Sequence, residues 1–377
     1  MAAPSPPTRW IIGCMTGTSL DGLDLALVEV TGTQLSLRAR IVAHQSHPLG
    51  ALREPLLALA SHEAHPPAAY LHTARRFGEL HAESIAEFCQ QHLPTTAHLH
   101  LVAAHGQTIC HLPMEHLSWQ LFDPWPIVRR LNVPVVHDLR QADLIAGGEG
   151  APITPIVDWL AFRHPSRSRT VVNLGGICNI THLPASATPD DVSGRDVGPC
   201  NLLLDGLAQR LLDTAYDTNG RQAASGTVDE TVVERIQQRI TSAVEDTGTL
   251  GREQFTRDWL DALQHDDLVH RATPADLLAS AAEAVARHIG DALVNADEVI
   301  VAGGGAKNPV LVQALQRRLG GVAVQSSDAL GIPVDAREAF AMAVLGALCE
   351  DGCAITLPQV TGARASGVAG VWVGRRG

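Results

Sequence analysis

The chain has 377 residues, of which 45% are hydrophobic and 18% charged, a composition typical of a globular protein large enough for two domains. Its formal net charge of −12 argues against a nucleic-acid partner, because binding to a phosphate backbone needs a clustered basic face. No apolar run approaches the ~20 residues of a membrane span, and the N-terminus lacks the features of a secretory signal, so we expect no membrane partner.

Two further counts narrow the class of protein. The seven cysteines are an odd number and lie mostly inside apolar segments, which indicates reduced thiols in a cytoplasmic protein. Only one of the 28 basic residues is a lysine, Lys307, and its surroundings match neither a P-loop nor the strand lysine of a protein kinase. If this protein uses ATP, it must bind the phosphates without a lysine.

The first structured segment predicts a hairpin that binds a ligand at its turn. An apolar strand at 10–12 leads into glycines and hydroxyls at 13–19, and a second strand follows at 25–30. Such a loop lets the backbone approach an anion closely, and Asp21 and Asp24 beside it suggest a cation between carboxylate and phosphate. The loop therefore predicts a site for a nucleotide phosphate and Mg²⁺. The alternative is an ordinary glycine-rich hairpin, in which both aspartates are turn residues.

The rest of the first half predicts a sheet with polar groups at its strand ends. Apolar spacing predicts a third strand at 35–43, helices at 50–61 and 67–92, and strands at 99–104, 119–122 and 133–136. His105, Gln107 and Thr108 follow one strand, where open α/β sheets bind ligands; a histidine with only a loop role is the alternative for His105. Arg140 lies between two carboxylates after another strand. We expect the chain to cross between domains at 147–152 and then to form a helix through Phe162.

The second half repeats the layout of the opening hairpin. Strands at 170–174 and 177–183 flank the turn Gly175–Gly176, which suggests two related halves. Asp196 is expected at a strand end before a helix at 202–212, with a helix N-cap as its alternative role. A capped helix begins at Thr273, and a strand at 298–302 leads through the glycine run at 303–305 to a helix starting near Asn308. The last predicted elements are a helix at 335–349 and a short strand at 371–373.

Together, the two hairpins, Asp196 and the late glycine run resemble the actin, hexokinase and Hsp70 superfamily. Within it, the chain resembles the bacterial 1,6-anhydro-N-acetylmuramic acid kinases through nine segments in order. These are GCMTGTSLDGLD (13–24), AHGQTICHLP (104–113), VPVVHDLRQAD (133–143), AGGEGAP (146–152), NLGGICNIT (173–181), DVGPCN (196–201), TLGREQF (249–255), VAGGGAKNP (301–309) and REAFAMAVLG (337–346). The resemblance implies an α/β fold with two facing ribonuclease H-like domains around a central ATP and sugar cleft. We place one domain at 1–136 plus 340–377 and the other at 137–339.

The resemblance also implies a reaction. These enzymes cleave the 1,6-anhydro bond with water and phosphorylate O6, giving N-acetylmuramate 6-phosphate and ADP in the recovery of cell-wall sugars. Asp196 then matches the general base, a role suited to a carboxylate, and Glu338 matches the glutamate that faces the sugar. Four residues fall where the family holds the sugar and its lactyl carboxylate: His105, Gln107, Thr108 and Arg140. An arginine fork suits that carboxylate because it pairs with both oxygens.

Further roles implied by the resemblance concern ATP and Mg²⁺. The residues expected at the phosphates and the adenosine are Gly17, Thr18, Ser19, Asp21, Gly22, Asp24, Gly175, Gly176, Gly303, Gly304, Gly305 and Asn308. Mg²⁺ is expected to be held through the phosphates, with Asp21 as a candidate ligand. A homodimer is implied as well.

The sequence departs from the family pattern at four positions and leaves two rival functions open. The family usually has Ser at Thr16, Gln at Glu149, Ala at Cys178 and Gly at Cys200, and the last of these bears on the backbone near the phosphates. One rival function is a kinase of the same fold for another sugar. The other is a nucleotide-binding regulator without small-molecule chemistry, which would need neither Asp196 and Glu338 nor the polar group after residue 104.

Overall fold

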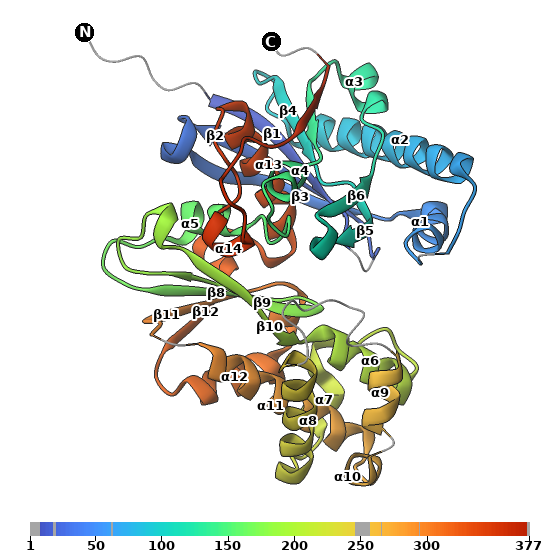
Figure 1. Ribbon diagram of the computed structural model, residues 1–377, viewed down its shortest axis with the longest axis vertical. Coiled ribbons are helices and arrows are strands. Elements are labelled where there is room, and N and C mark those ends of the chain that lie inside the picture. Colours follow the sequence, from blue (N-terminus) through green and yellow to red (C-terminus); the bar gives the residue numbers. More distant parts are fainter. Residues whose placement is uncertain are drawn as a thin grey trace. The chain divides into compact units, whose positions relative to one another are not determined.

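The computed structural model describes residues 8–17, 20–61, 63–245, 257–264, 266–293 and 295–374. The chain forms two compact units, each with its own sheet (Figure 1). The first unit comprises residues 1–161, 188–192 and 331–377, and the second comprises residues 162–187 and 193–330. No helix among the described residues is both long and apolar enough to cross a membrane.

Six strands form the sheet of the first unit, in the order β13-β7-β4-β1-β2-β3. β1, β2 and β3 make an antiparallel meander, β4 and β7 run parallel to β1, and β13 closes the edge antiparallel to β7. The strand bounds are β1 Thr8–Met15, β2 Leu23–Thr31, β3 Arg38–His47, β4 Leu99–Ala104, β7 Val135–His137 and β13 Val371–Val373. The central strands are continuous apolar runs because helices cover both faces of the sheet.

The helix α2 covers one face of this sheet. Its side chains Phe77, Ile85 and Phe88 are fully buried in one cluster with Ile12 and Val102 of the strands. The helices of the first unit are α1 Arg53–Leu59, α2 Pro67–His92, α3 Trp125–Leu131, α4 Gln141–Ile145, α5 Pro155–Phe162, α13 Arg337–Glu350 and α14 Pro358–Thr361. A separate two-stranded hairpin, which the sequence pattern predicted only in part, consists of β5 Gln107–Leu112 and β6 Leu117–Leu121.

The helix α13 packs against β1, β2 and β4, and two glycines let it approach the strands closely. A Cβ added to Gly13 of β1 would lie 1.8 Å from the carbonyl oxygen of Ala339, and one added to Gly346 would lie 2.6 Å from Cβ of Ala103. This approach explains why Gly13 lies inside the strand, which runs to Met15, although the sequence pattern predicted a loop from residue 13. The first turn of α13, which carries Glu338, is thereby fixed against the sheet.

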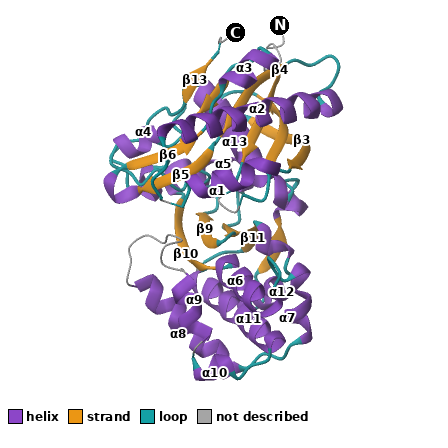
Figure 2. Ribbon diagram, turned by 90° about the vertical axis from the view of Figure 1, so that its right-hand side faces the viewer, coloured by secondary structure: helices purple, strands orange, loops and turns teal. Residues whose placement is uncertain are grey.

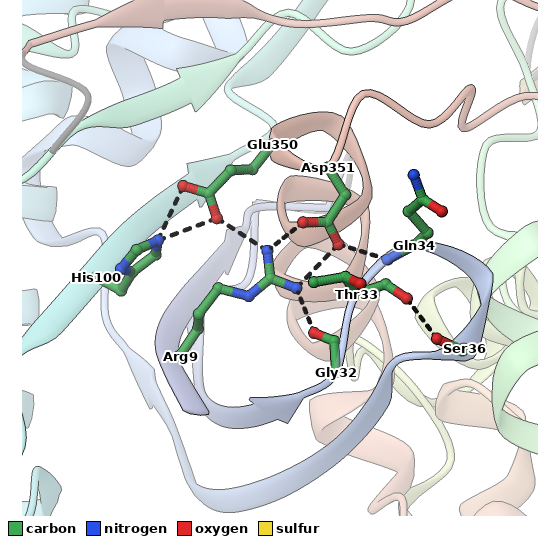
Figure 3. A network of polar contacts seen from close by, with 8 residues as sticks. All are labelled: Arg9, Gly32, Thr33, Gln34, Ser36, His100, Glu350 and Asp351. Carbon is green, nitrogen blue, oxygen red and sulfur yellow. Dashed lines mark hydrogen bonds and ion pairs between the residues drawn. The ribbon is translucent and has the colours of Figure 1, made fainter. Parts of the chain in front are cut away.

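A polar network ties the other end of α13 to the strands (Figure 3). The guanidinium of Arg9 at the start of β1 donates to Glu350 at 2.9 Å and to both oxygens of Asp351 at 2.7 and 2.9 Å. His100 of β4 also contacts Glu350, at 2.8 Å. The positive charge of Arg9 is thus held by two carboxylates at the C-terminal end of the helix, the end where the helix dipole favours a cation.

The second unit repeats the strand order of the first. Its sheet runs β10-β9-β8-β11-β12, with β8, β9 and β10 antiparallel and β11 and β12 parallel to β8. The strands are β8 Arg169–Leu174, β9 Ile177–Leu183, β10 Ser193–Pro199, β11 Glu298–Ala302 and β12 Ala323–Ser326. In both sheets three antiparallel strands are followed by two parallel ones, which is the ribonuclease H-like order. The expected α/β fold with two such domains is confirmed, and their facing around a cleft stays a prediction.

The helices of the second unit gather around α11, which contacts α6, α7, α8 and α12 (Figure 2). The bounds are α6 Asn201–Leu212, α7 Arg221–Ser225, α8 Glu230–Glu245, α9 Arg257–Gln264, α10 Asp267–His270, α11 Pro274–Ala292 and α12 Pro309–Leu319. The predicted cap of α11 is present, because the Thr273 hydroxyl accepts from the N–H of Asp276 at 3.2 Å. Small residues along α11 let the neighbouring helices approach it closely, and it is buried along most of its length.

Two boundaries differ from the sequence-based expectation. Residues 137–161, 188–192 and 331–339 were expected in the second domain but belong to the first unit, so the chain first crosses at 161/162 rather than at 147–152. The reason is long-range: Asp158 of α5 binds the Arg337 guanidinium at 2.6 and 2.8 Å, and both side chains are buried.

The third strand also begins later than predicted, at Arg38, because residues Gln34–Ser36 form a 3-10 turn.

Candidate active site

Three parallel strands of the first unit end at one edge of its sheet, and the predicted sugar residues follow them. β1 ends at Met15, β4 at Ala104 and β7 at His137. The N–H of His105 donates to the carbonyl of Cys14 at 3.2 Å, so the segment after β4 stays beside the end of β1. This edge is where open α/β sheets bind ligands.

His105 and Arg140 are brought together at this edge. The Nε and Nη2 groups of Arg140 donate to Nε2 of His105 at 3.1 and 2.8 Å, and Nδ1 of His105 contacts the carbonyl of Gly106 at 3.0 Å. A guanidinium cannot accept a hydrogen bond, so Nε2 accepts and the proton lies on Nδ1. Burial and the adjacent Arg140 charge lower the pKa of His105 to about 3. The histidine is therefore neutral, and both ring nitrogens are already hydrogen-bonded within the protein.

Arg140 keeps part of its hydrogen-bonding capacity. Its Nη1 group donates to the carbonyl of Gly150 at 2.6 Å, which with the two bonds to His105 uses three of five N–H groups. Two N–H groups remain, the number that a carboxylate accepts from a guanidinium fork. Burial lowers the pKa of Arg140 to about 10, and the nearby carboxylates of Glu338, Asp143 and Asp138 oppose that shift. The guanidinium is therefore still charged at neutral pH.

Gln107 and Thr108 lie at the start of β5 rather than in a loop. The Gln107 side chain is 1% exposed; its Nε2 donates to the carbonyl of Thr108 at 3.4 Å, and its Oε1 has no hydrogen-bond partner. The hydroxyl of Thr16, after β1, is buried and equally unpartnered. Buried polar atoms are nearly always hydrogen-bonded in proteins, so these two atoms mark places where a ligand or water would donate or accept.

Carboxylates gather around the end of the β1–β2 hairpin and the start of α13. Burial raises the pKa of Asp24, its hydrogen bond with Ser46 opposes this, and the charges of Asp335 and Asp21 reinforce it. Desolvation raises the pKa of Glu338 as well, although the side chain reaches solvent; Arg337 opposes that shift and Asp24 adds to it. Crowded carboxylates of this kind favour a nearby cation.

The described residues hold no group of three or more His, Cys, Asp or Glu side chains that could bind a metal. Mg²⁺ keeps several waters and usually binds one or two carboxylates together with substrate phosphates, so this donor set fits Mg²⁺ in that mode. Asp21, the candidate ligand, is exposed at this end of the hairpin. Gly22 leaves room for the Ser46 hydroxyl, which would lie 2.6 Å from an added Cβ.

The centre of the predicted phosphate loop lies partly outside the described residues, since Thr18 and Ser19 are not among them. On either side of them, the carbonyl of Gly17 accepts from the N–H of Leu20 at 3.1 Å. Leu20 has φ +57° and its side chain is buried, so the left-handed backbone there is held by packing.

In the second unit, the glycine turn after β8 is joined to the start of α6. The carbonyl of Gly176 accepts from the N–H groups of Cys200 and Leu202 at 2.8 and 3.1 Å, and that of Gly175 accepts from Asn201 at 3.0 Å. The Asn201 side chain donates to the carbonyl of Leu174 at 3.0 Å. The first N–H groups of α6 therefore bind the turn itself, and they fix its position at the carboxyl end of β8.

The late glycine run packs against the same turn. Gly303 has φ +78°, and an added Cβ would lie 2.6 Å from Oδ1 of Asn173, whereas one on Gly305 would lie 2.8 Å from Cβ of Leu174. The late glycine run thus lies against the end of β8, directly before the Gly175–Gly176 turn, and its part in binding a nucleotide stays a prediction. Asn308 has a different place: its Oδ1 accepts from Val310 and Leu311 at 3.1 and 3.3 Å and caps α12.

Asp196 lies within β10, three residues before its end, and not at the strand end where it was predicted. It pairs with Asn179 of β9, and the next pair in register is Gly198 with Cys178, so Val197 forms a β-bulge. Bulges redirect side chains and are frequent beside active sites. Asp196 is half-buried, and its charge contributes to raising the pKa of the buried Cys178 thiol.

Comparison with known proteins identifies the family of this chain. The sequence model of the family described as "Anhydro-N-acetylmuramic acid kinase" matches residues 9–374. The chain belongs to the anhydro-N-acetylmuramic acid kinase family. A relative of that name from Salinibacter ruber is 35% identical, covering 95% of this chain and 94% of its own. Another from Bradyrhizobium diazoefficiens is 34% identical, covering 93% and 95%.

One solved structure aligns with most of this chain at low sequence identity. Component A of (R)-2-hydroxyglutaryl-CoA dehydratase from Acidaminococcus fermentans aligns with 90% of this chain and 98% of its own, at 15% identity and a TM-score of 0.47. A likeness at this level says nothing about function.

Membership in the kinase family gives its departures from the usual pattern a structural meaning. Cys200, where the family usually has Gly, has φ −124° and ψ −93°, so this chain does not need a left-handed backbone there. Both Cys200 and Cys178 are fully buried, and burial raises the pKa of each thiol. Burial also raises the pKa of Glu149, which replaces the usual Gln, and the Asp143 charge adds to the shift.

Two residues that bind the predicted site segments were not singled out in the sequence. Asn201 ends the DVGPCN segment, and its side chain links the glycine turn to α6. Asp143 ends the VPVVHDLRQAD segment and is 1% exposed. Their presence in segments shared with the family was the available signal, but their partners lie far away in the sequence.

Proposed function

We propose that this chain is an ATP-dependent kinase that cleaves the 1,6-anhydro bond of 1,6-anhydro-N-acetylmuramate with water and phosphorylates O6. The products are N-acetylmuramate 6-phosphate and ADP, and the reaction belongs to the recovery of cell-wall sugars. The observation that carries the proposal is the family match over residues 9–374. The pairing of Arg140 with a neutral His105 supports it, because it leaves a guanidinium with two N–H groups for a sugar acid.

Asp196 is proposed as the general base. Water forms a bond to the anomeric carbon and gives a proton to the carboxylate, while the bond from that carbon to O6 breaks. O6 then bonds to the γ-phosphorus, and the bond from that phosphorus to the β–γ bridging oxygen breaks to release ADP. A bulge directly after Asp196 and its half-buried side chain support this role, since both allow a carboxylate to point away from the ladder.

Sugar recognition is proposed for the edge of the first unit. Arg140 binds the lactyl carboxylate through its two remaining N–H groups, and His105 holds the guanidinium in place. Gln107 offers its unpartnered Oε1 to a hydroxyl or amide of the sugar. Glu338 contacts a sugar hydroxyl or the attacking water, and the hydroxyl of Thr108 is a further contact.

Nucleotide binding is proposed for the glycine segments of both units. The phosphates are assigned to Gly17, Thr18, Ser19, Gly22, Gly175 and Gly176, and the adenosine to Gly303, Gly304, Gly305 and the neighbourhood of the Asn308 cap. When bound, Mg²⁺ neutralises charge that develops on the transferred phosphoryl group. Asp21 and Asp24 would hold it together with the phosphates. We further propose a cytoplasmic location, in keeping with the seven free cysteines, and a homodimer.

The decisive experiment follows the oxygen of water. The enzyme is incubated with ATP, Mg²⁺ and 1,6-anhydro-N-acetylmuramate in ¹⁸O-labelled water, and the product is analysed by mass spectrometry. We expect one ¹⁸O atom at C1 of the sugar and none in its phosphate. Phosphorylated product without label at C1 would refute the coupled mechanism. Absence of any sugar phosphate would favour the rival function, a nucleotide-binding regulator without small-molecule chemistry.

A further inference from the structure

Asp143 is a buried carboxylate near Arg140, and its charge acts on that guanidinium. It belongs to the short helix α4, and both of its oxygens are hydrogen-bonded. Oδ2 accepts from the N–H of Gly150 at 2.8 Å, and Oδ1 accepts from the hydroxyl of Thr361 at 2.7 Å. Both Asp143 and Thr361 are 1% exposed. Burying a carboxylate costs free energy unless it is hydrogen-bonded or paired, so the partners of Asp143 indicate its role.

Those partners hold the loop from Gly148 to Gly150. The N–H of Gly148 donates to the backbone carbonyl of Asp143 at 2.9 Å, and the N–H of Glu149 donates to the carbonyl of Thr361 at 2.9 Å. A Cβ on Gly148 would lie 2.2 Å from the Asp143 carboxylate, and Gly150 has φ +70°. Three successive N–H groups of the loop are therefore bound by Asp143 and Thr361, in a conformation that only glycines at both ends allow.

The same loop sets the position of Arg140. The N–H of Gly150 binds Asp143, and its carbonyl accepts from Nη1 of Arg140 at 2.6 Å. His105 holds the other side of the guanidinium, so Arg140 lies between an acceptor directly after β4 and an acceptor from the loop. If the loop turned, the Gly150 carbonyl would no longer accept from Nη1, and the two free N–H groups would change direction.

We propose that Asp143 is a positioning residue that aims Arg140 at the lactyl carboxylate through the Gly148–Gly150 loop, with Thr361 fixing Asp143 from the C-terminal segment. The inference rests on the proposed function, because that function assigns Arg140 to the carboxylate. According to this inference, Asp143 and Thr361 determine the preference for the sugar acid over its neutral analogue without touching the sugar. Binding of the rest of the sugar does not depend on them.

The test compares dissociation constants for 1,6-anhydro-N-acetylmuramate and its lactyl amide, measured by calorimetry. We expect the wild-type protein to bind the acid about tenfold tighter, the value of a charge-assisted pair. Asp143→Ala should reduce this preference to within about twofold and leave the affinity for the amide nearly unchanged. Asp351→Ala, which removes a half-buried carboxylate of the same unit that binds Arg9, should keep the full preference.

Milder variants separate positioning from folding. Asp143→Asn retains an acceptor for Gly150 and should keep most of the preference. If Asp143→Ala does not fold, Thr361→Val should lower the preference and Thr361→Ser should restore it. A wild-type protein without preference would refute the assignment of Arg140 in the proposed function. A wild-type preference that survives in Asp143→Ala, or in Thr361→Val, would overturn the inference about Asp143 alone.

Discussion

At the scale of single residues, strand register decides how a side chain can act. Asp196 and Arg195 are consecutive in β10 and point to opposite faces, and the bulge at Val197 interrupts the ladder directly after the aspartate. The backbone of Asp196 is held by its pairing with Asn179, and the register shifts directly after it. His105 shows the opposite case, because its two ring nitrogens are fully used within the protein.

We predict that Asp196→Asn lowers kcat by a factor of about 10²–10⁴, the usual contribution of a general base. The amide keeps the size and the polar character of the side chain but cannot take a proton from water. Nucleotide affinity should stay within a few-fold, as measured by calorimetry with ADP. Asp291→Asn, at an exposed ion pair with Arg318, is the control and should retain normal kcat. An active Asp196→Asn enzyme would refute the assignment of the base.

At the scale of elements, α13 shows how small residues place functional ones. Ala339, Ala343 and Gly346 let the helix lie directly on β1 and β4, and Arg9 holds its C-terminal end through Glu350 and Asp351. These contacts fix the position of the first turn of α13, which contains Glu338. The helix is apolar on all sides, in agreement with a buried position rather than a surface one.

We predict that Gly13→Ala destabilises the protein by about 3 kcal/mol, the upper part of the range for overpacking a core. The added methyl would lie 1.8 Å from the Ala339 carbonyl oxygen, so α13 must move away from β1. Urea denaturation measures the loss. Gly367→Ala is the control, because its nearest contact would be an ordinary 3.6 Å, and it should change stability by less than about 0.5 kcal/mol. Equal stability of the two variants would contradict the packing argument.

At the scale of the whole molecule, buried histidines couple stability to pH. His81 of α2 is 1% exposed, and its Nδ1 contacts the carbonyl of Phe77 at 2.8 Å. Burial lowers its pKa to about 4, whereas a histidine in the unfolded chain has a pKa of about 6.5. Between these values the unfolded state binds more protons than the folded state. The stability that neutral His81 provides is therefore complete above pH 6.5 and is lost as pH falls toward 4.

We predict that replacing His81 makes stability less sensitive to acid. Between pH 7 and pH 5, wild-type protein should lose about 2 kcal/mol more free energy of unfolding than His81→Leu, from a slope of about 1.4 kcal/mol per pH unit below 6.5. Urea denaturation at both pH values gives the difference, and comparison with the variant cancels the carboxylates that titrate in the same range. His72→Leu, at an exposed position of the same helix, should behave as the wild type. The same loss in His81→Leu as in wild type would contradict this prediction.

The sequence alone determined the local elements and the family. The strand at 298–302 and the return strand at 177–183 were predicted to the residue, because apolar runs between glycine turns depend on neighbouring residues only. The ordered segments and the single lysine pointed to a kinase without a P-loop. Asp196 was predicted at a strand end but lies within β10, and its bulge depends on the partner strand β9, which local pattern does not contain.

Only the tertiary structure decided which side chains meet. Asp143 and Thr361 are 218 residues apart, Arg140 and His105 are 35 apart, and Asp158 and Arg337 are 179 apart. Nothing in local periodicity selects one such pair among the many available carboxylates and cations, because the choice is made when sheets and helices pack. Because of that packing, the first unit extends to residue 161 and His105 accepts hydrogen bonds from Arg140. Asn308 caps the helix α12.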